Sequence, residues 1–101
     1  MEIIKWIEGW YLSNCDGDWE HTYGFEITTL DNPGWSVKID LEGTDLAGLK
    51  MEYMVVEKSD NDWYGLKIEN NVFEGAGDPS KLEFILEKFR EIVKDKTKSP
   101  A

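Results

Sequence analysis

Hydrophobic and polar positions follow a helical period at both ends of the chain and an alternating period between them. Near the N-terminus, apolar side chains recur every third or fourth position, which predicts a helix over residues 3–12. We expect this helix to pack its single apolar face on the rest of the fold. That face consists of Ile3, Ile7 and Trp10, flanked by Ile4 and Tyr11.

The C-terminal part of the chain shows the longer apolar stripe. Two start signals compete there, namely Asp78 followed by Pro79 and a capping box that begins at Ser80. We expect a helix over residues 79–95 and a disordered tail over residues 96–101. The stripe on which the helix prediction rests consists of Leu82, Ile85, Leu86, Phe89, Ile92 and Val93.

Between the two helices, apolar and polar residues alternate in the manner of half-buried strands. A turn sequence, Asn32-Pro33-Gly34-Trp35, separates the first two strands. It fits a type II turn, because proline presets φ at the second position and glycine accepts a positive φ at the third. The four predicted strands are residues 23–30, 35–41, 49–57 and 63–69.

Val72 and Phe73 are compatible with a short fifth strand, and Gly75-Ala76-Gly77 then breaks the alternation. The fold class predicted by these elements is α+β. It contains an antiparallel meander of four to five strands, with an N-terminal and a C-terminal helix packed on it. At 101 residues, the whole chain is expected to form a single domain, residues 1–101.

The net charge of −10 narrows the choice of partner. Nucleic acids and anionic membranes are disfavoured, since both require a basic surface. The excess negative charge is concentrated in residues 13–62, which carry twelve acidic residues and three lysines. An acidic half of this kind suits a basic protein partner. The plain alternative is an acidic surface that serves only solubility.

One cysteine, Cys15, excludes an internal disulfide and favours a reducing compartment. The first residues lack the pattern of a signal peptide, and the apolar runs are too short to span a membrane. The expected location is therefore the cytoplasm. We expect the protein to be a monomer or a weak homodimer.

The first candidate site is Cys15 with His21, as a nucleophile and its base. Reactive thiolates lie in electropositive surroundings, whereas three carboxylates flank this pair. A half-buried structural cysteine is the favoured alternative. Those three carboxylates, which also define a second candidate, belong to Asp16, Asp18 and Glu20.

The second candidate is a metal site, because the three acids alternate as at the start of a calcium loop. The pattern fails at His21 and Ile27, where such a loop requires glycine and glutamate. A structural zinc site would require four ligands and paired cysteines. We therefore expect no metal and no cofactor.

The third candidate is a protein-binding face. Trp19 lies among the acids of the first loop and combines a hot-spot residue type with steering charges. A second acidic loop beside Trp63 repeats this chemistry. Two alternatives stay open: the Trp19 ring could be tucked under its loop as local core, and the two loops could lie apart. The expected partner-binding residues are Asp16, Asp18, Trp19, Glu20, His21, Asp60, Asp62 and Trp63.

A group of motifs within residues 6–45 is distinctive for so short a chain. The motifs are Trp10-Tyr11, Cys15-Asp16-Gly17-Asp18-Trp19-Glu20-His21, Gly24, Thr29-Leu30-Asp31-Asn32-Pro33-Gly34-Trp35 and Ile39-Asp40-Leu41. Together they resemble the immunity 53 family, small bacterial proteins assigned to polymorphic toxin systems. The resemblance implies a cytoplasmic antitoxin that binds and neutralises a cognate toxin domain, often a nuclease or another basic effector.

The sequence therefore leads to one main hypothesis and one alternative. The main hypothesis is a stoichiometric inhibitor, not an enzyme, which meets a basic toxin of nuclease type through an acidic, tryptophan-containing face. The alternative is a small cysteine-dependent enzyme that uses Cys15 and His21, and the resemblance is what implies a sulfurtransferase-like activity for it.

Overall fold

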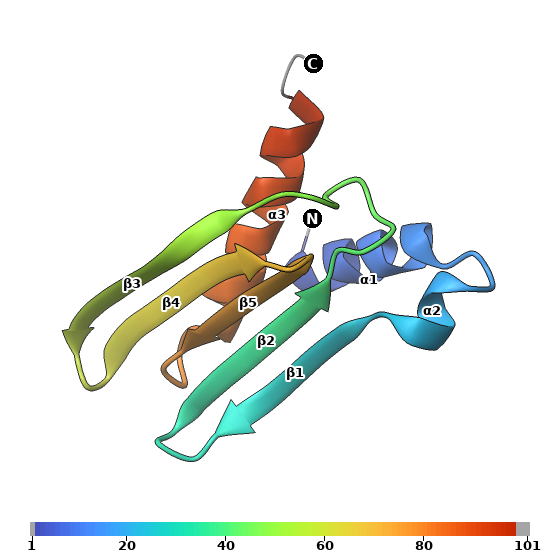
Figure 1. The fold of residues 1–101 in the computed structure, drawn as a ribbon. Coiled ribbons are helices and arrows are strands. Elements are labelled where there is room, and N and C mark those ends of the chain that lie inside the picture. The colour runs from blue at the N-terminus through green and yellow to red at the C-terminus, as the bar shows by residue number, and fades with distance from the viewer. Residues whose placement is uncertain (1, 99–101) are drawn as a thin grey trace.

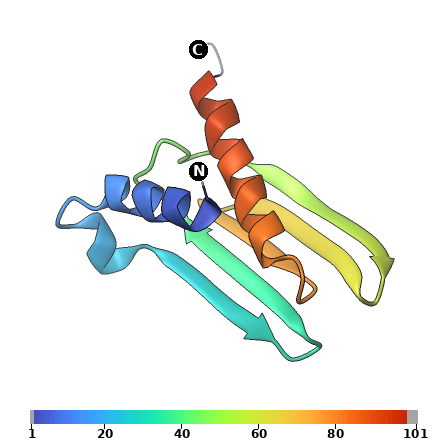
Figure 2. The same ribbon diagram turned by 180° about the vertical axis from the view of Figure 1, so that it is seen from behind.

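The five strands form one open antiparallel sheet, and both long helices lie on the same face of it (Figures 1 and 2). The computed structural model describes residues 2–98. This architecture confirms the predicted α+β class. The elements are α1 (Ile3–Asn14), α2 (Trp19–Thr22), β1 (Phe25–Leu30), β2 (Gly34–Asp40), β3 (Met51–Ser59), β4 (Asp62–Glu69), β5 (Val72–Gly77) and α3 (Leu82–Lys98).

The strand order is β1-β2-β5-β4-β3, so the sheet is not a continuous meander. The hairpin β1–β2 docks on the meander β3–β4–β5 through antiparallel pairing of β2 with β5. Residues 41–50 carry the chain from β2 to the far edge, where β3 begins (Figure 1). The sequence pattern left the strand order open, and the structure interrupts the predicted meander once, because β5, and not β3, pairs with β2.

Strand β5 is longer than the sequence pattern indicated. Gly75-Ala76-Gly77, which we expected to end the sheet, lies inside the strand. A Cβ atom on Gly75 would lie 2.6 Å from Cγ2 of Ile85, and one on Gly77 would lie 2.7 Å from Cβ of Lys81. The glycines therefore allow the start of the C-terminal helix to approach the strand backbone closely.

The limits of the C-terminal helix and the type of the first turn also differ from the prediction. Helix α3 begins at Leu82 and not at residue 79, and it continues through Lys98. Residues 96–98 of the predicted tail are therefore helical, whereas residues 99–101 lie outside the described residues. The Asn32–Pro33 peptide bond is cis, and Gly34 does not have a positive φ, so the turn between β1 and β2 is not of type II.

The core lies between the covered face of the sheet and the two helices. Phe89 of α3 is its aromatic centre, since its fully buried ring contacts the rings of Trp6, Trp10, Phe25 and Phe73. Within residues 2–98, no helix is long and apolar enough to cross a membrane. The main buried cluster consists of Ile3, Val37, Ile39, Leu41, Leu46, Leu66, Ile68, Phe73, Ile85, Leu86 and Phe89.

Candidate partner-binding site

Two carboxylates of the loop before β1 hold the loop itself in shape. Oδ1 of Asp16 accepts hydrogen bonds from the N–H groups of Asp18 and Trp19, both at 2.9 Å. The two carboxylate oxygens of Glu20 accept from the N–H groups of Asp16 and Gly17, at 2.9 and 2.8 Å. The N–H groups of Trp19 and Asp18 lower the pKa of Asp16, and main-chain N–H groups also lower that of Glu20. Both acids are therefore fixed in position and ionised at neutral pH.

Trp19 adopts the tucked position that the sequence left open. Its side chain is only 6% exposed and packs against Tyr11 and Trp10, with centroid distances of 5.9 and 6.4 Å. Its Nε1–H donates a 2.7 Å hydrogen bond to the main-chain carbonyl of Glu42. The ring is thus local core and tethers the first acidic loop to the segment that follows β2.

This tether brings together acids that are far apart in the sequence. Residues 13–24 and 41–49 contain no lysine and no arginine. Four of the five carboxylate side chains in these segments belong to exposed residues, and that of Glu20 is half-buried. We call this group the acidic end of the molecule. It consists of Asp16, Asp18, Glu20, Glu42 and Asp45.

The second predicted loop, between β3 and β4, lies at the opposite end of the strands from α2 (Figures 1 and 2). The eight predicted residues therefore do not form one compact patch. Asp60 is exposed, Trp63 is half-buried, and Asp62 forms a 2.8 Å ion pair with Lys81.

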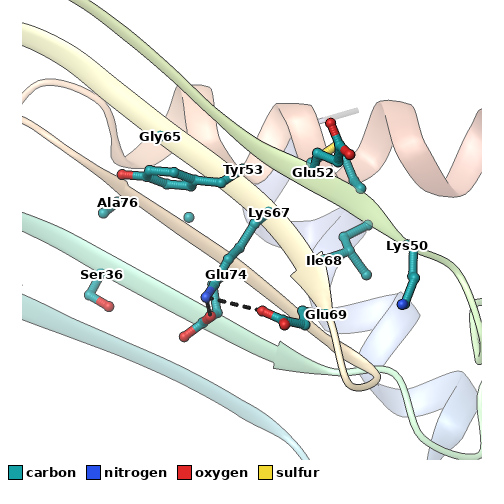
Figure 3. Close-up of a pocket in the computed structure, with 12 residues that line it drawn as sticks. Ser36, Lys50, Glu52, Tyr53, Gly65, Lys67, Ile68, Glu69, Glu74 and Ala76 are labelled. Atoms are coloured by element: carbon teal, nitrogen blue, oxygen red, sulfur yellow. Dashed lines mark hydrogen bonds and ion pairs between the residues drawn. The ribbon is translucent and has the colours of Figure 1, made fainter.

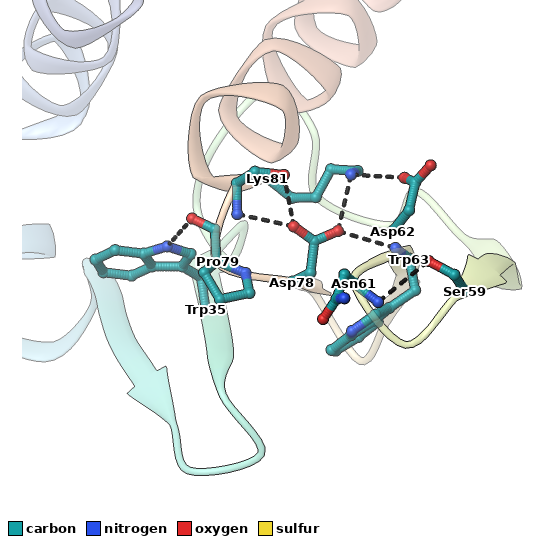
Figure 4. A network of polar contacts seen from close by, with 9 residues as sticks. Trp35, Ser59, Asn61, Asp62, Trp63, Asp78, Pro79 and Lys81 are labelled. Atoms are coloured by element: carbon teal, nitrogen blue, oxygen red, sulfur yellow. Dashed lines mark hydrogen bonds and ion pairs between the residues drawn. The ribbon is translucent and has the colours of Figure 1, made fainter.

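Beneath this second loop lies a polar network that the sequence analysis missed (Figure 4). Asp78, only 1% exposed, accepts hydrogen bonds from Lys81 Nζ at 2.8 Å and from the Trp63 N–H at 2.9 Å, and also from Ser80. Lys81 and Ser80 hold the pKa of the Asp78 carboxyl far below its ordinary value. Asp62 and Asp78 raise the pKa of Lys81. Asp78 thus joins β4 to the start of α3 and serves structure; its spacing of three from Lys81 was the available sequence signal.

Cys15 and His21 are not joined by any hydrogen bond within residues 2–98. The thiol of Cys15 donates to the carbonyl of Tyr11 at 3.3 Å, as a half-buried helix-end cysteine, whereas His21 is exposed on α2. In the same part of the chain, no three His, Cys, Asp or Glu side chains are grouped so that they could hold a metal ion.

The uncovered face of the sheet carries a row of alternating charges. Glu26, Lys38, Glu74 and Lys67 are cross-strand neighbours on β1, β2, β5 and β4. Nζ of Lys67 lies 3.2 Å from Glu74, and Nζ of Lys38 lies 3.9 Å from the same carboxylate. Glu74 raises the pKa of Lys67, and Glu69 raises it to a smaller extent. We call this surface the open sheet face; it includes Glu26, Lys38, Asp40, Tyr53, Gly65, Lys67, Glu69, Glu74 and Ala76.

These features define a small acidic α+β protein with an acidic end and an open, charged sheet face. The family model of Immunity protein 53 matches residues 4–94, and the chain belongs to this family. No match was found among curated proteins or among solved structures. Membership implies an immunity protein of a toxin system, which binds a cognate toxin.

Proposed function

We propose that this protein neutralises a basic toxin domain of nuclease type by binding it stoichiometrically through the acidic end. Membership of the family supports a neutralising function, and the negative net charge supports a basic partner. We place the toxin-binding surface at the acidic end because of the hydrogen bond from Trp19 to Glu42. This bond brings together two acidic segments that lack lysine and arginine.

The acidic end would act as a substitute for nucleic-acid phosphates. A nuclease cleft collects basic side chains around the phosphates that it binds, and exposed carboxylates can meet the same side chains. Asp16 and Glu20 are pre-organised by the loop N–H groups, whereas Asp18 is exposed beside them. Steering by such charges accelerates association and weakens with salt.

Trp19 supports this surface from below, since its buried ring fixes the loop on which the carboxylates stand. His21 lies on the same short helix as Glu20 and shares the proposed contact. Asp60, Asp62 and Trp63 contribute only if the interface runs along the sheet to its other end. An interface of standard size covers roughly 800 Å² of each partner. We propose that the protein acts in the cytoplasm, where a nuclease would reach its substrate.

The test is co-expression and co-purification with the toxin domain encoded beside the gene, followed by affinity measurements at about 0.05 to 0.5 M salt, a range across which screening becomes strong. We expect a one-to-one complex whose Kd rises steeply with salt. A tight complex that is indifferent to salt would contradict the acidic end as the contact surface. The lack of any complex would overturn the proposal as a whole.

A further inference from the structure

We infer that the toxin interface continues from the acidic end across the open sheet face and that Tyr53 is its aromatic anchor. This inference rests on the proposed function. It gives Tyr53 the role that the sequence had assigned to Trp19, whose ring is buried.

Tyr53 is 69% exposed although it lies on a β-strand, and its ring extends across β4 over Gly65 towards Ala76 (Figure 3). A Cβ atom on Gly65 would lie 3.1 Å from the Tyr53 hydroxyl oxygen and 3.2 Å from its Cε1 atom. The ring therefore rests on the bare backbone of β4, with its other face in solvent. Tyrosine is a common hot-spot residue, and it loses little conformational entropy on binding.

The ring borders a hollow of about 620 Å³ with a floor of small residues. Gly65, Gly75 and Ala76 contribute to this lining, which leaves space for a side chain from a partner. The charged residues that also line the hollow are Lys50, Glu52, Lys67, Glu69 and Glu74, so acids outnumber lysines. An apolar or aromatic side chain with an arginine or lysine nearby fits this combination.

A second hollow, of about 530 Å³, connects this surface with the region of α2. Both hollows are lined by Lys67, Glu69 and Glu74, and the second also reaches Thr22 at the end of α2. One partner can therefore contact the acidic end and Tyr53 together. Across the two hollows five acids face three lysines, which favours a basic partner over a second copy of this acidic chain. These residues are Glu26, Asp40, Glu52, Glu69 and Glu74, and Lys38, Lys50 and Lys67.

Tyr53→Ala with Leu12→Ala as its matched control tests the inference. Leu12 is 70% exposed but lies on α1, on the covered side of the sheet. Binding of each variant to the toxin domain encoded beside the gene, made inactive by an active-site substitution, is measured by calorimetry. We expect Tyr53→Ala to raise Kd by about tenfold or more, as loss of a hot-spot residue does, whereas Leu12→Ala has little effect. Tyr53→Phe should bind almost normally, because the ring makes the contact.

Three outcomes would contradict the inference in different ways. Tyr53→Ala could bind like the wild type while a variant with a neutralised acidic end binds more weakly. In that case Tyr53 is not the anchor, and the proposed function stands. If the wild type sediments as a dimer that Tyr53→Ala disrupts without affecting toxin binding, a second copy occupies the face. If the wild type does not bind the toxin, the proposed function itself fails.

Discussion

The indole Nε1 of Trp19 donates a 2.7 Å hydrogen bond to the main-chain carbonyl of Glu42, 23 residues further along the chain. The bond joins the loop before β1 to the loop after β2 and so creates the acidic end. Because the Trp19 ring is also packed against Tyr11, it acts as the internal support of this surface.

Trp19→Phe retains an aromatic ring but removes the N–H donor. We expect the free energy of unfolding to fall by about 1–3 kcal/mol, because the Glu42 carbonyl loses its partner in a part-buried site. Trp35→Phe is the matched control, since it removes a 2.9 Å bond from Nε1 to the Pro79 carbonyl that is exposed to water. Urea denaturation should show the larger loss for Trp19→Phe. Equal losses would show that the Trp19 bond is no more than a surface contact.

Gly75→Ala tests the close approach of α3 to β5. The new methyl group would lie 2.6 Å from Ile85 Cγ2 and 3.2 Å from Leu66 Cδ2, so we expect a destabilisation of about 1–3 kcal/mol from overpacking. Gly9→Ala, in α1, meets nothing within 4 Å and should stabilise the protein by about 0.5–1 kcal/mol through helix propensity. Thermal and urea unfolding of the two variants should show changes in the free energy of unfolding of opposite sign. Similar stabilities for both variants would refute the packing role of Gly75.

The Asp78 network should make the stability of the protein depend on pH. The pKa of Asp78 is lower in the folded protein than in the unfolded chain, so its contribution is present above about pH 4 and is lost as pH falls towards the folded pKa. Asp16 and Glu20 act in the same direction. Asp78→Asn should lower Tm at pH 7 and flatten the fall of Tm between about pH 5 and pH 2.

Asp31→Asn, in the exposed turn after β1, provides the comparison for this experiment. Circular dichroism melting curves across the pH range should show the wild-type profile for this variant. A wild-type profile for Asp78→Asn as well would mean that the network does not couple folding to protonation.

The sequence predicts most of the fold because each long element has a clear period. The apolar stripe of α3 and the alternation of β2 are read directly from the residues that they bury. The glycines of β5 misled the prediction, since the same residue type marks a turn or a close contact between elements. The strand order follows from the pairing of β2 with β5, a contact between distant residues that local patterns do not encode.

The candidate site is predicted only in part, for a similar reason. The acids of the first loop are evident in the sequence, but their neighbour Glu42 is defined by a contact across the fold. The burial of Trp19 depends on rings from α1, and the exposure of Tyr53 depends on Gly65 in the next strand. Composition alone favours tryptophan over tyrosine as an anchor, whereas packing buries Trp19 and leaves Tyr53 exposed.

Cys15→Ser addresses the enzyme alternative. The Cys15 thiol donates to the Tyr11 carbonyl at 3.3 Å, and a serine hydroxyl can replace this donor. We expect the variant to protect cells from the toxin as well as the wild type does. Loss of protection with an unchanged Tm would revive a catalytic role for the thiol.

The most direct measurement of the central claim compares two triple variants that remove the same charge. Asp18→Asn, Glu42→Gln and Asp45→Asn together neutralise exposed members of the acidic end and spare the loop-forming Asp16 and Glu20. The control combines Glu2→Gln, Glu83→Gln and Asp95→Asn, all exposed at or on the two long helices.

Affinity for the inactive toxin domain is measured for both variants at about 0.1 M salt, where surface charges still interact over about 10 Å. The account predicts that the acidic-end variant binds roughly 10- to 100-fold more weakly, with a shallower dependence on salt, while the control binds nearly as well as the wild type. Equal affinity of the two variants would contradict the acidic end as the surface that neutralises the toxin.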